Sequence, residues 1–164
     1  LIAPDKDVDG LSADGIYPSA TAQAIDWLLA GYNVELSDKQ IAIVGRGKLV
    51  GAPLEKMWRQ RGLDVHVYDK AKPATAAELQ KCAVIVTATG VPHLITAEMI
   101  APGAVVVDAG TASEGGVLVG DVDDAVRQRS DITITPKKGG VGPLTYAVLF
   151  DHLIEACLRQ LGKL

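Results

Sequence analysis

An apolar run that breaks into closely spaced glycines constrains this chain more than any other feature. Residues 41–44 (IAIV) run into Gly45, Gly47 and Gly51, and a helical pattern follows at 54–61. Glycine tolerates positive φ angles and lets main-chain N–H groups approach a phosphate at the N-terminus of a helix. The order of strand, glycine turn and helix therefore predicts a nucleotide-binding turn. Its spacing, G-x-G-x-x-x-G, is one residue longer than the usual dinucleotide fingerprint.

Short apolar runs alternate with helical patterns along the rest of the chain. Strands are expected at residues 40–44, 64–68, 83–87, 104–107 and 132–135, with a small hairpin at 113–119. Helical segments are expected at residues 22–30, 54–61, 75–81, 96–100, 121–128 and 143–162. Alternation of this kind implies right-handed βαβ crossovers and a parallel sheet. The predicted fold class is therefore α/β: a Rossmann-like three-layer domain with a mostly parallel sheet and helices on both faces.

The length of the chain suits one domain with a substantial core. We predict a single domain over residues 1–164, in which residues 1–20 are a lead-in and residues 143–162 form a C-terminal helix. Thr21 is expected to cap the N-terminus of the first helix. Pro143 is expected at the first position of the last helix, where a missing N–H costs nothing.

Charge, hydropathy and cysteine content bear on the possible partners, the location and the cysteine chemistry of the chain. The formal net charge is −4 and the pI is near 5.3, so no basic stripe is available for a nucleic-acid backbone. No apolar run is expected to reach the length of a membrane span and no secretory signal is recognised, so the predicted location is cytoplasmic. Cys82 and Cys157 lack metal-ligand spacing, and each is predicted to be a small buried side chain, with a disulfide less expected.

Four of the expected strands end in loops that carry glycine or proline. These strands end at Val44, Thr87, Val107 and Thr135. Ligands of open parallel sheets bind outside the carboxyl ends of the strands, so the four loops are predicted to converge on one crevice. The last loop, GGVGP at residues 139–143, suits close approach of a ligand, although a tight structural turn would use the same glycines.

Asp69 is the candidate that discriminates between cofactors. It follows Gly45 by 24 positions and stands at the expected end of a strand. A carboxylate there can accept hydrogen bonds from both ribose hydroxyls of NAD and would repel the 2′-phosphate of NADP. Lys70 and Lys72 keep NADP open, because a cation could answer that phosphate. The alternative is a turn aspartate that faces solvent.

Other chemistry-bearing residues form no recognisable site. His66, His93 and His152 have neither metal-ligand nor catalytic-triad spacing, so each is predicted to be structural or exposed. Asp5, Asp7 and Asp9 lie within five residues but lack the spacing and terminal glutamate of a calcium loop. We therefore predict no metal site.

Six motifs occur in order along the chain. They are KDVDG (6–10), VGRGKLVGAP (44–53), TGVP (89–92), PGAVVVD (102–108), VGDV (119–122) and GGVGPLT (139–145). Together they resemble the bifunctional methylenetetrahydrofolate dehydrogenase/methenyltetrahydrofolate cyclohydrolase family, the FolD-type proteins. The resemblance runs over nearly the whole chain. It implies NAD(P)-dependent oxidation of 5,10-methylenetetrahydrofolate, followed by hydrolysis of the methenyl product to 10-formyltetrahydrofolate.

The resemblance also implies roles for individual residues. Asp9 matches the family aspartate that holds the pterin ring and is our candidate for both catalysis and substrate binding. Gly140 and Pro143 match the loop beside substrate and nicotinamide. The implied cofactor-binding residues are Thr21, Gly45, Arg46, Gly47, Lys48, Val50, Asp69, Lys70, Thr89, Gly90, Thr111 and Thr145. The implied partners are a tetrahydrofolate substrate and, because the family commonly forms dimers through this domain, a second copy of the chain.

The chain departs from the family pattern at several places, and these departures limit the activity that we expect from it. Family members carry an N-terminal α/β domain with a Tyr-x-x-x-Lys motif, whose lysine drives the cyclohydrolase step. We expect neither that motif nor room for that domain here, so the chain resembles only the NAD(P)-binding half and is expected to have weak or absent catalysis alone. Gly47 replaces a usual serine, and Asp69-Lys70 replaces the His-Ser pair more usual in NADP-using relatives, which favours NAD. The alternative is a non-catalytic, free-standing nucleotide-binding module; the folate motifs argue against a third hypothesis, the domain of an amino-acid or quinate-type dehydrogenase.

Overall fold

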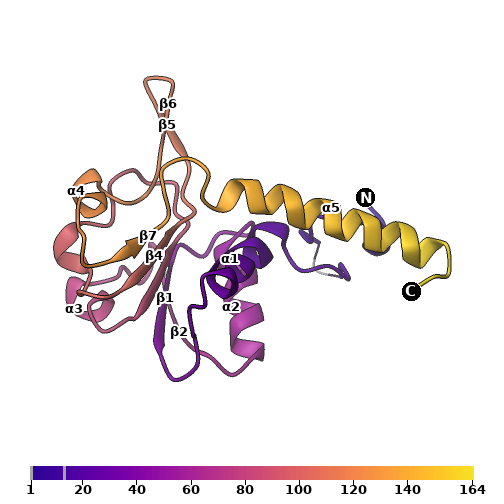
Figure 1. Ribbon diagram of the computed structural model, residues 1–164, viewed down its shortest axis with the longest axis horizontal. Helices are drawn as coiled ribbons and strands as arrows, with labels where there is room; N and C mark the ends of the chain where they lie inside the picture. Colours follow the sequence, from indigo (N-terminus) through magenta and orange to yellow (C-terminus); the bar gives the residue numbers. More distant parts are fainter. Residues whose placement is uncertain (1, 13) are drawn as a thin grey trace.

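A five-stranded parallel sheet forms the centre of the molecule (Figure 1). The structure is a computed structural model that describes residues 2–12 and 14–164; Leu1 and Ala13, which belong to the predicted lead-in, lie outside the described residues. The strands are β1 (Gln40–Val44), β2 (Asp64–Tyr68), β3 (Val84–Thr87), β4 (Val105–Asp108) and β7 (Thr133–Ile134), in the order β2-β1-β3-β4-β7. All neighbouring pairs are parallel, which confirms the predicted fold class.

The central strands β1, β3 and β4 are largely apolar because both faces of the sheet are covered. Ile41 and Ile43 point into one core cluster, which packs against the helices at residues 20–31, 51–60 and 141–160. Ala42 and Val44 point into a second cluster on the opposite face. Side chains alternate between the faces of a strand, so one continuous apolar run serves two cores.

Three longer helices cover the first face, and short ones cover the second (Figure 1). The helices are α1 (Ala20–Gly31), α2 (Gly51–Gln60), α3 (Ala76–Leu79), α4 (Asp124–Arg127) and α5 (Val141–Gln160), with 3-10 turns η1 (Pro4–Lys6) and η2 (Ala97–Met99). All predicted helical segments exist. The predicted bounds of α3 and α4 are too long: Thr75 caps α3 and Asp123 caps α4 through their side chains.

Thr21 and Pro143 do not hold the helix positions predicted for them. Ser19, not Thr21, is the N-cap residue of α1, and its hydroxyl donates to the carbonyl of Leu49 (2.7 Å) rather than capping the helix. Thr21 therefore lies inside the first turn. The last helix begins at Val141, which makes Pro143 its third residue. Proline is still tolerated there, because the first turn of a helix has no internal acceptor for its N–H groups.

Helix α5 extends from the body of the molecule and packs along α1 (Figure 1). The buried His152 joins it to the N-terminal segment: Nδ1 lies 2.7 Å from the carbonyl oxygen of Val8, and Nε2 lies 3.0 Å from Oε1 of Gln23. The imidazole also stacks on Tyr17, with ring centroids 4.9 Å apart. These contacts confirm a structural role for this histidine.

One face of α5 is apolar and exposed. Tyr146, Phe150, Leu153 and Ile154 recur at helical spacing and are all at least 48% exposed. By length and composition, α5 is long and apolar enough to cross a membrane, so the expectation that no apolar run reaches this length is wrong. We refer to these four residues as the α5 apolar face.

The predicted hairpin is present. Strands β5 (Ala112–Glu114) and β6 (Val117–Val119) pair antiparallel and stand out from the body (Figure 1). Val117 and Leu118 are more than 60% exposed. The hairpin leaves β4 and returns at Gly120 to the carboxyl edge of the sheet.

Candidate functional site

Four strands end at the same level. The register pairs Val44 with Tyr68 and with Thr87, and pairs Thr87 with Asp108. The loops that follow line two cavities, not the single crevice that the sequence predicts. One cavity lies beside the glycine turn and the other lies at the start of α5.

The cavity beside the glycine turn has a volume of about 420 Å³. It lies at the exits of β1, β2 and β3, and its lining is largely apolar, including Val91, Leu94 and Ile95. Of the predicted cofactor residues it gathers Gly45, Arg46, Gly47, Asp69, Lys70 and Thr89. We refer to it as the β1–β3 cavity.

The second cavity has a volume of about 590 Å³ and lies between the exit of β4 and the first turn of α5. We refer to it as the β4–α5 cavity. Of the predicted residues it gathers Thr21, Val50, Thr111, Gly140, Pro143 and Thr145. Lys137 and Lys138 also line it, on the loop before GGVGP.

Three predicted residues line neither cavity. Lys48 lines a separate hollow with Gly10 and Ser12. Gly90 lines neither cavity, although Thr89 and Val91 on either side of it line the β1–β3 cavity. Asp9 is exposed. Its side chain lines neither cavity, although its carbonyl accepts a hydrogen bond from the N–H of Ala20 (3.0 Å), next to Thr21.

The glycine turn is built by close backbone approach. Gly45 has a φ of 105° and donates its N–H to the carbonyl of Tyr68 (2.8 Å). A Cβ on Gly51 would overlap the carbonyl oxygen of Gly45, so the chain folds back on itself before α2. Among the hydrogen bonds between described residues, none uses the N–H of Gly47 or Lys48. Free N–H groups ahead of a helix N-terminus suit a phosphate.

Asp69 lies at the rim of the β1–β3 cavity and shapes its own turn. Oδ1 accepts hydrogen bonds from the N–H of Ala71 (2.8 Å) and of Lys72 (3.0 Å). These bonds, that from Lys72 first, lower the pKa of the carboxyl below its usual value, so it is ionised at neutral pH. Oδ2 makes no hydrogen bond to a described residue, so it can accept from a ligand.

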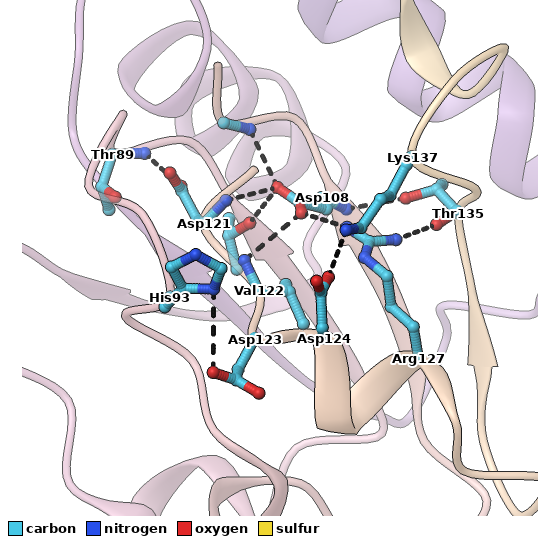
Figure 2. Close-up of polar contacts among 12 residues, drawn as sticks. Thr89, His93, Asp108, Asp121, Val122, Asp123, Asp124, Arg127, Thr135 and Lys137 are labelled. Carbon is cyan, nitrogen blue, oxygen red and sulfur yellow. Dashed lines mark hydrogen bonds and ion pairs between the residues drawn. The ribbon is translucent and has the colours of Figure 1, made fainter. Parts of the chain in front are cut away.

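A buried polar network lies under the strand exits (Figure 2). Asp108, at the end of β4, accepts hydrogen bonds from the N–H groups of Gly110, Asp121 and Val122. Asp108 therefore caps backbone N–H groups of the segments on both sides of the hairpin.

The sequence did not reveal the cation that balances Asp108. Arg127, in α4, donates from Nη2 to Asp108 (2.5 Å) and from Nη1 to the carbonyl of Thr135 (2.6 Å). The Asp108 side chain is only 2% exposed, so the charge needs this partner. Nineteen residues separate the pair. An arginine inside a predicted acidic helix was the only available signal.

Asp121 is a second buried carboxylate in this network. It is fully buried, and Oδ2 accepts from the N–H of Thr89 at 2.6 Å (Figure 2). Burial is the main cause that raises the pKa of this carboxyl; the hydrogen bonds from Thr89 act in the opposite direction. Its other oxygen, Oδ1, has no hydrogen-bond partner among the described residues.

The Tyr-x-x-x-Lys spacing does occur once, at Tyr68 and Lys72, contrary to the expectation from the sequence. Tyr68 is the buried last residue of β2, and Lys72 lies in the following loop with Nζ 5.4 Å from the centre of the tyrosine ring. Burial is the main cause that raises the pKa of Tyr68. The pair forms a cation–π contact.

The remaining histidines and cysteines divide between surface and core. His66 lies 3.3 Å from Asp64 and His93 lies 3.7 Å from Asp123, both with exposed rings. Cys82 is buried and free, as predicted, whereas Cys157 is free but exposed on α5, so its predicted burial is wrong. Within residues 2–12 and 14–164, no three His, Cys, Asp or Glu side chains gather as a metal site.

Comparison with known proteins gives a consistent result. Residues 19–161 match the model of the tetrahydrofolate dehydrogenase/cyclohydrolase NAD(P)-binding domain. The "bifunctional protein FolD" of Nocardia farcinica is 40% identical over 172 residues, which cover 98% of this chain and 60% of the relative. The chain spans about 60% of the length of the curated relatives that it matches.

Two solved structures match with the same coverage. A 5,10-methylenetetrahydrofolate dehydrogenase from the silkworm, Bombyx mori, has a TM-score of 0.87 and 34% identity, over 99% of this chain and 62% of that one. The methylenetetrahydrofolate dehydrogenase-cyclohydrolase of Trypanosoma brucei, solved with NADP and an inhibitor, has a TM-score of 0.86 and 31% identity, over 98% of this chain and 61% of that one.

Proposed function

This chain belongs to the tetrahydrofolate dehydrogenase/cyclohydrolase family through its NAD(P)-binding domain, and from that premise we propose that it is the cofactor-holding part of a methylenetetrahydrofolate dehydrogenase. The observation that carries the proposal is the glycine turn between the two cavities, with its free N–H groups ahead of α2. When bound, NAD(P) supplies the hydride acceptor for oxidation of 5,10-methylenetetrahydrofolate.

The two cavities suit the two ends of a dinucleotide. The adenosine end would lie in the β1–β3 cavity, where the lining is apolar and Asp69 is available to a ribose. The nicotinamide end would lie in the β4–α5 cavity, where Thr111, Thr145 and the GGVGP loop supply polar side chains and backbone. The residues between them, 45–50, would hold the pyrophosphate.

Within this proposal the favoured cofactor is NAD. Support comes from Asp69, whose ionised carboxylate has one free oxygen at the rim of the β1–β3 cavity. That oxygen can accept from a ribose hydroxyl and repels a phosphate at the same place. Lys70 lines the same cavity and is the residue that could favour NADP.

The test is to titrate the chain with NAD and NADP separately by calorimetry. We expect tighter NAD binding, and we expect Asp69→Ala to weaken it about tenfold or more, the loss that corresponds to a charge-assisted hydrogen bond. Asp69→Asn keeps an acceptor for the Lys72 amide, so it separates the loss of charge from the loss of the turn. Asp64→Ala, an exposed aspartate at the other end of β2, is the matched control.

The titrations test the choice of NAD separately from the proposed function. Tighter binding of NADP, or an NAD to NADP ratio unchanged by Asp69→Ala, contradicts the choice of NAD alone. Absence of binding for both dinucleotides contradicts the proposed function.

The dehydrogenase and cyclohydrolase reactions would need a second domain to complete the folate site. Asp9, the candidate for pterin binding and catalysis, is exposed and lines neither cofactor cavity. The α5 apolar face offers a surface on which an N-terminal domain that carries the catalytic lysine would pack. We therefore expect this chain alone to show little or no turnover of 5,10-methylenetetrahydrofolate while it still binds cofactor.

The same assay addresses the alternative of a non-catalytic module. Turnover that appears when a family N-terminal domain is added in trans supports a folate enzyme, because cofactor binding alone would not produce it. Cofactor binding with no turnover under those conditions favours the free-standing module. A homodimer formed through this domain and a cytoplasmic location complete the proposal, and sedimentation analysis tests the first of these.

A further inference from the structure

The turn after β3 is held from one side by a single buried carboxylate. Thr89 is the first residue of the TGVP segment, and its N–H donates to Oδ2 of Asp121 at 2.6 Å. Asp121 is 0% exposed and follows Gly120, in the segment between β6 and α4. A segment beyond the hairpin therefore sets the position of a turn that lies 32 residues earlier.

The backbone around Asp121 strengthens this link. The N–H of Ile95 donates to the carbonyl of Asp121 (3.0 Å), and the N–H of Asp123 donates to the carbonyl of Ile95 (2.9 Å). The loop from Thr89 to Ile95 is thus tied to residues 121–123 at both ends, by a side chain at one end and by a parallel bridge at the other. Its first residue and its last residue line the β1–β3 cavity.

Asp121 also contacts the wall of the second cavity. Gly110, which lines the β4–α5 cavity, has no room for a side chain because a Cβ there would overlap the carboxylate of Asp121. The N–H of Asp121 is held by Oδ1 of Asp108, and Arg127 holds Asp108 in turn (Figure 2). One carboxylate therefore lies between Thr89 of one cavity and Gly110 of the other.

We propose that Asp121 is a positioning residue for dinucleotide binding, which sets the distance between the two cavity walls by holding Thr89 against the exit of β4. Asp121 lines neither cavity and acts through Thr89 and Gly110. The inference rests on the proposed function, because it assumes that one ligand uses both cavities.

The test compares Asp121→Ala with the rescue variant Asp121→Asn, whose amide oxygen can still accept from the Thr89 N–H. Asp123→Ala is the control: it lies two residues along, removes the cap on the N–H of Ala125 and the 3.7 Å contact with His93, and keeps the hydrogen bond from Thr89 to Asp121. Dissociation constants for NAD and NADP are measured by calorimetry at a temperature well below every melting temperature. ADP-ribose, which lacks nicotinamide, is measured in the same way.

We expect Asp121→Ala to weaken binding of the full dinucleotide by about tenfold, equivalent to about 1.4 kcal/mol. We expect a smaller loss for ADP-ribose, which needs only one wall. Asp121→Asn should recover affinity to within about threefold of the wild type, and Asp123→Ala should bind as the wild type does even if it melts earlier. A role in stability alone predicts that affinity at low temperature does not change in any variant.

A second readout separates this inference from the proposed function. Amide hydrogen exchange at Thr89 should be fast in Asp121→Ala and slow in Asp121→Asn, with or without ligand. Wild-type dinucleotide affinity in Asp121→Ala overturns the inference and leaves the proposed function intact. A wild-type chain that binds no dinucleotide fails the proposed function, and unchanged exchange at Thr89 then overturns the positioning contact independently.

Discussion

Two glycines of the glycine turn differ in what a side chain would meet. A Cβ on Gly51 would overlap the carbonyl oxygen of Gly45, whereas a Cβ on Gly47 has no neighbour within 4 Å. The first glycine is required by packing of backbone against backbone. The second occupies open space, where the family more usually has serine.

This contrast gives a paired prediction. Gly51→Ala should lower the free energy of unfolding by about 1–3 kcal/mol, the usual cost of overpacking, because backbone has to move. Gly47→Ala should change it by less than about 0.5 kcal/mol. Thermal unfolding followed by circular dichroism measures both. Similar melting temperatures for the two variants would show that the turn can relax around Gly51.

The two cysteines should differ in reactivity. Burial raises the pKa of the Cys82 thiol to about 11, while Cys157 lies exposed on α5. Because the thiolate is the reactive form, Cys157 should react with a disulfide reagent at pH 8 and Cys82 only after unfolding. Thiol titration in buffer and in denaturant, with Cys157→Ser as control, measures this. Two fast thiols in the native chain would contradict the buried position of Cys82.

The raised pKa of Cys82 also makes the stability of the chain depend on pH. The folded pKa of Cys82 lies above its ordinary value of 9.0, so the folded chain holds that proton more tightly than the unfolded chain does. The contribution of this thiol to stability is therefore complete below pH 9 and is lost as the pH rises through about 11. Cys82→Ala should remove this part of the alkaline loss of stability.

Secondary structure elements were predictable where local pattern decides them. Strands β1 and β2 have the predicted bounds, because Ile- and Val-rich runs are flanked by polar residues and glycines. The start of α2 at Gly51, three residues before the predicted start, depends on the fold-back of the glycine turn. The short helices α3 and α4 begin directly after their side-chain caps, Thr75 and Asp123, and each is four residues long.

The contact between α5 and the N-terminal segment is a property of these elements and not of local pattern. His152 and Val8 are 144 residues apart, so no spacing rule could relate them. If the buried ring is removed, the Val8 carbonyl and the Gln23 side-chain amide each lose a hydrogen-bond partner.

Replacing this ring should therefore release the N-terminal segment locally. We expect His152→Ala to destabilise the chain by about 1–3 kcal/mol, as unpaired buried polar groups do, with the largest effect near η1. Hydrogen exchange of residues 4–10, compared with the exposed His66→Ala, measures it. Unchanged protection at those residues would show that other contacts hold the segment.

At the scale of the whole molecule, the sequence predicts the class of sheet but only part of the site. Alternating strands and helices predict a parallel sheet with its ligands at one edge. They do not predict that the strand exits divide into two cavities. Asp108, Arg127 and Asp121 meet at this edge from β4, α4 and the segment between β6 and α4, so no local pattern relates them.

The α5 apolar face is the largest feature of the molecule that its own contacts leave unexplained. Phe150 is 64% exposed and Ile154 is 60% exposed, one helical turn apart. Contiguous exposed apolar side chains of this kind mark surfaces that associate.

We expect the chain alone to self-associate with increasing concentration. The double variant Phe150→Lys/Ile154→Lys should reduce this association at least severalfold and leave the melting temperature nearly unchanged, because both side chains are exposed. Analytical ultracentrifugation over a hundredfold concentration range measures it. Tyr32→Lys, at an exposed tyrosine on the end of α1, is the control. Equal association of the double variant and the control would exclude the α5 apolar face as the contact.

The fit between glycine and carboxylate at the exit of β4 constrains the order in which substitutions can accumulate. The carboxylate of Asp121 occupies the space where Gly110 would carry a side chain, and the carboxylate of Asp108 does the same at Gly120. In each pair the aspartate has to become smaller before the glycine can become larger, so a lineage can leave this arrangement through only one of two mutational orders. Gly110→Ala should be severely disruptive alone and much milder after Asp121→Ala, a sign of epistasis between two positions that are eleven residues apart.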